Sequence, residues 1–427
     1  NWGSDYHFYK ISPTDGELVD QNALMFPTAT SVRVTSMAYA GSKLYFAGNL
    51  NRTGKEQLYM WDGTNPAVQM GTYEPLGRSL YFAEFNAAGG WSRNESVGTV
   101  GNSSIMNLAL DDAVSYEPYL LNPDGTVTLV KNFNTGSEGS SPDVYCSGST
   151  ASSDLLVANL PLLDSNWGKD VIVEATSDGT NLTYKVLDVG ALYNICGFVA
   201  SGSDTYFSAE TDADGQGLYK MSSNHTITRL GNMTNPVRDG IAKIVNNKYY
   251  YFSDDYADLW VYDLATNTDS QLTGTNSSIV DYDSIDQLFF SGNYAVFQSR
   301  LKSDNYDAVF TVDLAAATYT ENVIVTDVNA VDHNPDRLAI IGNTVYYVDV
   351  TDWNAGEGEK LYKAPITGGN ATLVADVSAE PGSVDYVYAV GADIYVSYWN
   401  DTTRLLELKR FVGGTALTQV SLPAGAV

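Results

Sequence analysis

The sequence has few basic residues, and this shortage excludes two classes of function. Its 427 residues include 23 Lys and Arg against 51 Asp and Glu, so the formal net charge is −28. Binding to nucleic acid or to anionic lipid requires basic side chains facing phosphates, and neither is expected here. No apolar run approaches the roughly 20 residues that a membrane-spanning helix needs. The sequence therefore predicts a folded, acidic protein without a membrane span.

Helical periodicity is also missing. No segment keeps an apolar period of 3.6 residues over three turns. Short segments with alternating apolar and polar residues, rich in Val, Ile, Tyr and Phe, recur instead, as is typical of half-buried strands. Asn-Gly, Asp-Gly and Gly-Gly pairs between them favour tight turns. The expected fold class is all-β, with almost no helix.

These segments form a repeat whose copies are spaced about 40 to 60 residues apart. The first strand of each copy is expected at 43–49, 154–160, 204–210, 248–254, 293–299, 343–349 and 392–398. The second is expected at 57–64, 170–180, 217–224, 258–264, 308–314, 360–369 and 405–411. Residues 105–130 make a looser eighth copy, and further apolar strands flank each pair. Four antiparallel strands at this period predict a single β-propeller of four-stranded antiparallel blades, with eight blades, or seven as the alternative.

Three of these copies resemble known extracellular repeats. KLYFAGN…QLYMWDGT (43–64) and DTYFSAETDADGQGLYKM (204–221) resemble bacterial and archaeal repeats of the "LYF…ELW..DGT" type. KLYKAPITGGNATLV (360–374) resembles the blades of lipoprotein-receptor YWTD-like propellers. Several other copies lack the tryptophan or the DGT. The resemblance covers residues 31–427 and implies a secreted or surface-attached propeller, generally non-enzymatic.

Residues 1–30, called the N-terminal segment below, precede the propeller expected at 31–427. Within the segment, residues 6–18 have the pattern of half a blade, a strand pair around an Asp-Gly turn. The final copy already looks complete without them. Either this strand pair adds to the edge of the last blade and closes the ring, or it pairs with another subunit, since an unpaired edge invites such addition. A miscounted blade is the third interpretation.

The two cysteines, Cys146 and Cys196, are 50 residues apart, which is one repeat length. Both fall in expected innermost strands of neighbouring blades, where a disulfide would stabilise the fold by about 4 kcal/mol in the chain-entropy picture. The alternative is two unrelated buried thiols. Metal or redox catalysis at these cysteines is not expected, because the sequence has no CxxC motif.

Several features favour the cell exterior. The chain begins at Asn1 rather than Met, as expected if a signal peptide had been removed, and lysine is scarce. Nine Asn-x-Ser/Thr sequons are candidate glycosylation sites. They are Asn51, Asn94, Asn102, Asn181, Asn224, Asn232, Asn276, Asn370 and Asn400.

Glu210, Asp212 and Asp214 are candidate calcium ligands. These acidic residues alternate before Gly215, as in the first half of a calcium-binding loop. The distal acidic ligand is missing, because position 12 counted from Glu210 is Met221. The alternative is a solvated acidic hairpin loop. Calcium is the one cofactor that the sequence suggests.

Candidates for catalysis are scarce. The three histidines are His7, His225 and His333, and no GxSxG or HExxH motif occurs. No pair of carboxylates is singled out among the acidic residues. The sequence therefore predicts a protein that is not an enzyme, with an extracellular polysaccharide hydrolase as a minor alternative.

Tryptophans suggest a binding surface instead. Trp167, Trp353 and Trp399 fall at or near loops between the second and third strands of blades, which share one face of a propeller. Trp91 belongs to a Gly, Ser and Asn-rich insertion at 86–104. Aromatic rings with polar neighbours suit protein partners or sugar rings, although each ring would equally cap its own blade. The leading hypothesis is a protein-binding or assembly module of a surface structure or appendage, whose partners are other extracellular proteins or further copies of this chain. The alternative is a glycan-binding lectin.

Overall fold

The computed structural model is nearly all β, as the sequence predicts. It describes residues 8–11, 18–29, 31–40, 42–51, 56–75, 99–100, 103–110, 117–122, 124–129, 143–150, 152–160, 169–177, 182–187, 189–253, 258–272, 280–281, 285, 287–301, 307–325, 335–349, 360–376, 382–390, 392–400, 405–411 and 418–419. Within these ranges the strands form one two-stranded sheet and eight larger sheets. The one helix of these ranges, α1 (Asn22–Met25), has four residues. None of the helical structure described is long and apolar enough to span a membrane.

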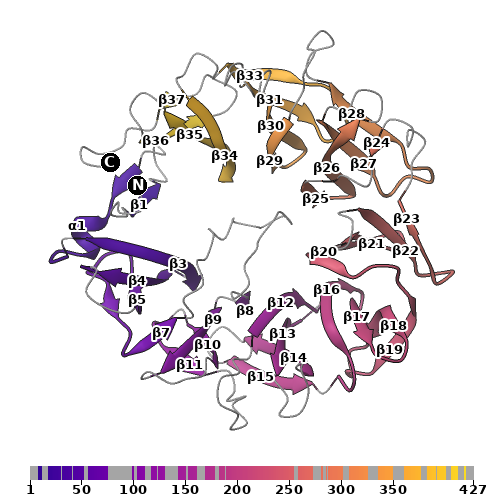
Figure 1. Ribbon diagram of the computed structural model, residues 1–427, viewed down its shortest axis with the longest axis horizontal. Coiled ribbons are helices and arrows are strands. Elements are labelled where there is room, and N and C mark those ends of the chain that lie inside the picture. Colours follow the sequence, from indigo (N-terminus) through magenta and orange to yellow (C-terminus); the bar gives the residue numbers. More distant parts are fainter. Residues whose placement is uncertain are drawn as a thin grey trace.

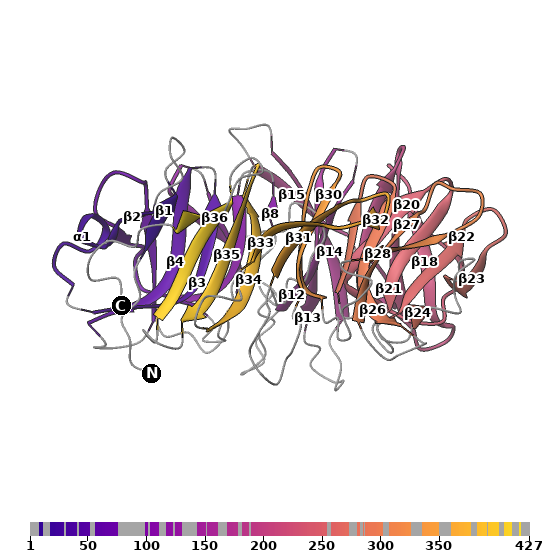
Figure 2. The ribbon, with the colours of Figure 1, turned by 90° about the horizontal axis from the view of Figure 1, so that it is seen from above.

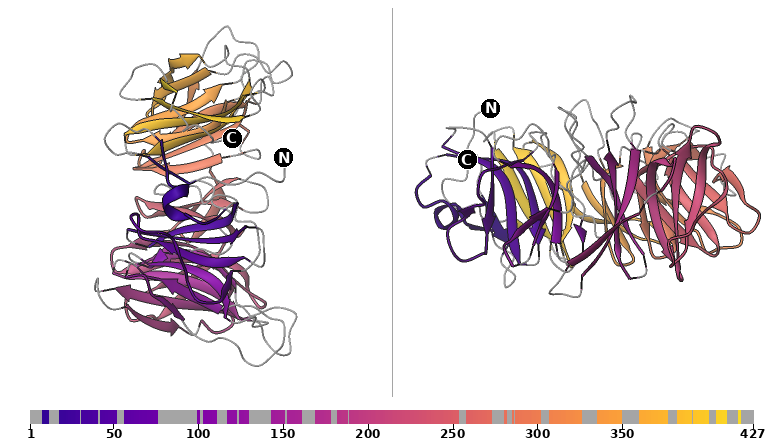
Figure 3. Two further views of the ribbon diagram at one scale, coloured as in Figure 1. Left: turned by 90° about the vertical axis from the view of Figure 1, so that its left-hand side faces the viewer. Right: turned by 90° about the horizontal axis from the view of Figure 1, so that it is seen from below.

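The larger sheets follow one another in chain order around a common centre (Figure 1). Seen from the side, the ring is a flat disc, and the strands run across its thickness (Figure 2 and Figure 3). Most sheets are antiparallel and ordered as in the sequence, and in each four-stranded sheet the first strand lies nearest the centre.

The first half of the chain contributes four of these sheets. The first sheet contains β3 (Val32–Ala40), β4 (Lys43–Leu50), β5 (Gln57–Trp61) and β6 (Val68–Gln69). The second contains β7 (Tyr73–Pro75), β8 (Thr99–Val100), β9 (Ser103–Leu110), β10 (Glu117–Leu121) and β11 (Val127–Leu129). The third contains β12 (Asp143–Ser149), β13 (Asp154–Leu160), β14 (Lys169–Ser177) and β15 (Leu182–Leu187). The fourth contains β16 (Tyr193–Ser201), β17 (Asp204–Thr211), β18 (Gly215–Met221) and β19 (Ile227–Asn232).

The second half contributes the other four. The fifth sheet contains β20 (Val237–Val245), β21 (Lys248–Ser253), β22 (Leu259–Asp263) and β23 (Thr268–Gln271). The sixth contains β24 (Val280–Asp281), β25 (Gln287–Ser291), β26 (Tyr294–Leu301), β27 (Asp307–Asp313), β28 (Glu321–Val325) and β32 (Gly369–Asn370). The seventh contains β29 (Pro335–Ile341), β30 (Thr344–Asp349), β31 (Lys360–Pro365) and β33 (Thr372–Asp376). The last contains β34 (Gly382–Val390), β35 (Asp393–Asn400), β36 (Leu405–Phe411) and β37 (Thr418–Gln419).

The core lies between consecutive sheets. Second strands such as β21 are buried on both faces, which explains why Tyr249, Tyr250, Tyr251 and Phe252 form a continuous aromatic run instead of alternating with polar residues. One cluster of buried side chains joins the third and fourth sheets, another the fourth and fifth, and another the fifth and sixth. In this part of the ring, consecutive sheets therefore stabilise each other.

The N-terminal segment makes a sheet of its own. Its strands β1 (Tyr9–Ile11) and β2 (Leu18–Asp20) pair only with each other in the described part of the chain, and α1 follows them. Figure 1 shows this hairpin and α1 at the junction between the last and the first sheet. The sequence predicts a strand pair within residues 6–18; the structure has such a pair, with its second strand at Leu18–Asp20, at and beyond the end of the predicted segment.

Candidate functional site

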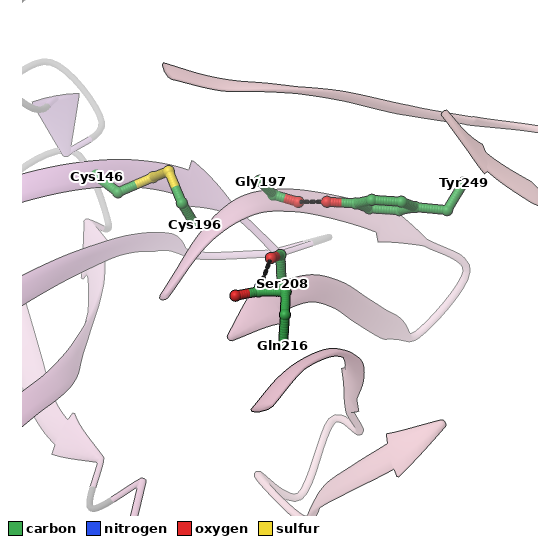
Figure 4. Close-up of a disulfide and its surroundings, with 6 residues drawn as sticks. All are labelled: Cys146, Cys196, Gly197, Ser208, Gln216 and Tyr249. Carbon is green, nitrogen blue, oxygen red and sulfur yellow. Dashed lines mark hydrogen bonds between the residues drawn. A yellow bond between two sulfur atoms is a disulfide. The ribbon is translucent and has the colours of Figure 1, made fainter. Parts of the chain in front are cut away.

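The best-defined group of polar and sulfur-containing side chains lies where the third, fourth and fifth sheets meet. Cys146 in β12 and Cys196 in β16 form a disulfide with a Cα–Cα distance of 5.7 Å (Figure 4). Both cysteines lie beside irregularities in strand register, which turn side chains out of the regular alternation. The structure therefore agrees with the predicted disulfide and not with two unrelated thiols. The bond joins the inner strands of consecutive sheets.

The residue after Cys196 continues this link to the next sheet. The Tyr249 hydroxyl of β21 donates a hydrogen bond to the Gly197 carbonyl at 2.6 Å (Figure 4). Gly197 has a φ of +72°, and a Cβ atom there would collide with that hydroxyl. Burial raises the pKa of Tyr249, so the phenol stays protonated and keeps its donor. Nearby, Gln216 Nε2 donates to Ser208 Oγ within the fourth sheet.

The acidic residues proposed for calcium lie on the β17–β18 hairpin. Asn194 Nδ2 donates to Glu210 Oε2 at 3.0 Å, and the Tyr193 hydroxyl donates to Asp212 Oδ1 at 3.2 Å. The two carboxylates thus face β16, while Asp214 is exposed on the turn before Gly215. Across the described ranges, no group of three His, Cys, Asp or Glu side chains is placed to hold a metal. The structure does not bring these three residues together, and calcium binding stays a prediction.

A network that the sequence did not indicate connects the third sheet to the fourth. Glu174 of β14 lies at its centre: Ser153 Oγ donates to Glu174 Oε1 at 2.7 Å, and His225 Nε2 lies 2.6 Å from Glu174 Oε2. Lys185 Nζ lies 3.1 Å from His225 Nδ1. Because a lysine ammonium only donates, Nδ1 accepts and Nε2–H donates to the carboxylate.

The order of this network decides what it does chemically. The carboxylate stands between the serine and the histidine, so the imidazole does not contact the Ser153 hydroxyl and cannot take its proton, as a nucleophilic serine would require. His225 has a φ of +66° in the turn between β18 and β19 of the fourth sheet, and its ring lies beside Glu174 of the third sheet. No local sequence signal identifies such a contact, and the network is a polar bridge between sheets.

The tryptophans predicted to form a binding face are mostly outside the described residues. This holds for Trp91, Trp167 and Trp353. Trp399 lies in β35, one residue before its end, where it pairs with Ser383 and Leu406. A shared tryptophan face, and glycan binding at it, therefore stay predictions from the sequence. His7 and His333 are also outside the described residues.

The glycosylation candidates divide in the same way. Asn51, Asn224, Asn232 and Asn370 are exposed. Asn400 lies in β35. Residues outside the described part are Asn94, Asn102, Asn181 and Asn276.

Comparisons with known proteins identify no family. No family model and no curated protein matches the chain. Among solved structures, the chain is similar to puromycin hydrolase, at 11% identity over 87% of this chain and 59% of that chain, with a TM-score of 0.43. It is similar to dipeptidyl peptidase 4 of Porphyromonas gingivalis, at 11% identity over 95% and 62%, with a TM-score of 0.41. It is also similar to a prolyl endopeptidase, at 12% identity over 91% of this chain and 55% of that chain, with a TM-score of 0.38.

These comparisons correct one prediction. Peptidases recur among the similar structures, which contradicts the prediction that the chain is not an enzyme, and we withdraw that prediction. It depended on the absence of known motifs and on the small number of histidines, and neither observation excludes catalysis. The chain spans about 55–62% of the length of these peptidases. At these identities and TM-scores, their activities do not carry over to this chain.

Proposed function

We propose that the eight larger sheets are the blades of one β-propeller and that the N-terminal segment closes it. Three observations support this architecture. The sheets follow the chain in order around one centre, the first strand of each four-stranded sheet lies nearest that centre, and buried clusters connect consecutive sheets. The hairpin β1–β2 lies at the junction where the ring begins and ends.

We further infer a secreted or cell-surface location. The Cys146–Cys196 disulfide supports it, because disulfides persist in oxidising compartments. Exposure of the Asn51, Asn224, Asn232 and Asn370 side chains makes these four sequons accessible to glycosylation. The net charge of −28 favours solubility in such a setting.

We infer that the propeller acts as a protein-binding and assembly module of a surface structure. One observation carries this proposal: most of the exposed large apolar side chains of the described part belong to the N-terminal segment and to the first sheet, on which that segment packs. Of the six that stand out in the described part, five lie between residues 19 and 68. They are Val19, Leu24, Met37, Tyr39 and Val68. Apolar side chains that are exposed on neighbouring elements favour contact with a partner.

Self-association of the full chain tests the proposal. Light scattering after size exclusion and native mass spectrometry would be measured over a concentration series. We expect oligomers that are lost when Val19, Leu24 and Val68 are replaced together by Asp. Leu373→Asp is the matched control, because Leu373 is equally exposed but lies on β33 of the seventh sheet. Association that persists in the triple variant, or that is lost equally in the control, would contradict the proposal.

A further inference from the structure

The N-terminal segment packs on one face of the first sheet through an aromatic cluster. The Phe8 ring lies 5.1 Å from that of Phe46 and 5.7 Å from that of Phe26, and Phe26 meets Phe46 edge-on at 5.6 Å. Met25 is buried in the same cluster, together with Leu44 and other residues of β4 and β5. The segment thus buries aromatic and aliphatic side chains against the first sheet.

In other parts of the ring, the corresponding face holds the preceding sheet. In the seventh sheet, Leu338, Val345 and Tyr347 pack against Val296 and Ile324 of the sixth. The opposite face of the first sheet follows the same rule, since Ala38, Tyr45 and Leu58 pack against the second sheet. The N-terminal segment therefore occupies a position that a whole sheet occupies elsewhere.

This face is larger than the part that the segment covers. Met37 is opposite Phe46 and Tyr39 is opposite Leu44, so their side chains share the face of the aromatic cluster. Met37 is 36% exposed and Tyr39 is 56% exposed. Counted from the turn, their equivalent in the seventh sheet is the pair Leu338 and Ile340, of which Leu338 is 6% exposed. The docking face thus continues beyond the aromatic cluster towards the ring centre.

Between the described residues of the segment and the first sheet, main-chain links are few. Within the segment, Gln21 N donates to Phe8 O and Phe8 N donates to Asn22 Oδ1. These hydrogen bonds would be kept if the segment left its own first sheet. Ala67 N donates to Met25 O at 2.9 Å across the contact. A reverse turn, in which Ala29 N donates to Phe26 O, then leads into β3. The segment is a preassembled unit on a short connection, which is the arrangement that permits exchange between copies.

We propose that copies of this chain exchange their N-terminal segments, so that the segment of one copy docks on the first sheet of another. The proposal rests on the proposed assembly function and names its partner, a second copy of this chain. An exchanged segment makes the same contacts as one that folds back on its own first sheet. The equilibrium between the monomer with its own segment docked and the dimer with exchanged segments therefore depends on the connection at residues 27–31 and on protein concentration.

The experiment uses the full chain and shortens that connection. A variant lacking Thr28 and Ala29 removes the reverse turn, so the segment reaches its own first sheet less easily and another copy's more easily. Two batches of different isotopic mass are mixed, and native mass spectrometry counts dimers of mixed mass. We expect the deletion to raise the dimer fraction at least tenfold at equal concentration. Phe26→Ala in the same background should return the chain to monomers, whereas Leu373→Ala, at an exposed position of the seventh sheet, should not.

The outcomes separate this proposal from the proposed function. If oligomers of the unaltered chain persist in Phe26→Ala, exchange is wrong and assembly through another surface stands. If the deletion variant is folded, as judged by circular dichroism, and stays monomeric, exchange is wrong. A chain that never associates at any concentration contradicts both. Phe8→Ala provides the second test of the cluster if Phe26→Ala fails to fold.

Discussion

The Tyr249 hydroxyl donates a hydrogen bond to the carbonyl of Gly197, the residue that follows Cys196. Through the Cys146–Cys196 disulfide on one side and this hydrogen bond on the other, three consecutive sheets are joined along one line (Figure 4). A covalent bond and a buried hydrogen bond thus act at the same strand, β16, and substitutions there distinguish their contributions.

Gly197→Ala should destabilise the fold by about 2 kcal/mol or more, because the new Cβ meets the Tyr249 hydroxyl and lies 2.9 Å from Val237 Cγ1. Gly202→Ala is the matched control. Gly202 has a similar φ of +64° but no atom within 4 Å of a new Cβ, so it reports the backbone cost alone, about 1 kcal/mol. Urea unfolding measures both. Equal losses would show that the contact with Tyr249 is not tight.

Tyr249→Phe removes the donor to Gly197 and should cost about 1–2 kcal/mol, since a buried carbonyl loses its partner. Tyr262→Phe should be neutral or slightly stabilising. The Tyr262 side chain is also buried, but its hydroxyl has no hydrogen-bond partner in the described part of the structure. Thermal unfolding compares the two variants. A loss in Tyr262→Phe as large as that in Tyr249→Phe would contradict this assignment.

Reduction of the disulfide should lower stability by about 4 kcal/mol, the chain-entropy value for a loop of this size. Thermal unfolding with and without a thiol reductant measures the effect. A variant with Cys146→Ser and Cys196→Ser should already have the lower melting temperature and should not respond to the reductant. A melting temperature that the reductant leaves unchanged in the native chain would contradict the prediction.

The Glu174–His225 contact should show coupling in a double-mutant cycle. Glu174→Ala and His225→Asn are suitable changes, because Asn tolerates the positive φ at position 225. We expect a coupling energy of about 1 kcal/mol, since both side chains are mostly shielded from water. The Lys220–Asp204 pair, longer at 3.3 Å and more exposed, is the control and should couple less. Additive losses at Glu174 and His225 would show that the bridge contributes nothing.

Stability should fall as the pH rises above 10, because folded tyrosines resist ionisation. Partial burial and the carboxylates of Glu210 and Asp212 raise the pKa of Tyr193 from 10.0 to about 12. The unfolded chain therefore releases this proton first, so the stabilisation is complete below pH 10 and is lost between pH 10 and pH 12. Tyr193→Phe should reduce the slope of unfolding free energy against pH in this interval. An unchanged slope would contradict the assigned pKa.

Local patterns predicted most of the strands. The apolar run in DLLVANL predicts a strand at 154–160, and β13 has these bounds. Between β20 and β21, Asn246 and Asn247 both have positive φ, as a two-residue hairpin turn requires. The repeat spacing of the cysteines also allowed their pairing to be considered. Strand identity and turn chemistry are encoded by neighbouring residues, so they can be inferred from sequence.

Apart from the disulfide, contacts between sheets were not predicted. In the sixth sheet, β28 pairs in parallel with β32, which comes from a loop of the seventh sheet. The Glu174–His225 contact joins residues 51 positions apart. For the acidic hairpin, the local pattern suggested calcium ligands, but two of its carboxylates accept hydrogen bonds from the neighbouring strand β16. In the first two cases the partner is determined by how sheets pack, and in the third by strand pairing within the fourth sheet. The sequence of one strand encodes neither.

The position of the N-terminal segment also determines when the apolar face of the first sheet is covered during synthesis. The aromatic cluster on the first sheet needs only residues 8–67, so that sheet can cover its apolar face long before residue 427 is made. If the last sheet covered it instead, the face would stay exposed to solvent while the whole chain was translated. A nascent chain whose first sheet is covered early exposes less hydrophobic surface, and it is therefore less prone to aggregate with other chains translated from the same messenger RNA.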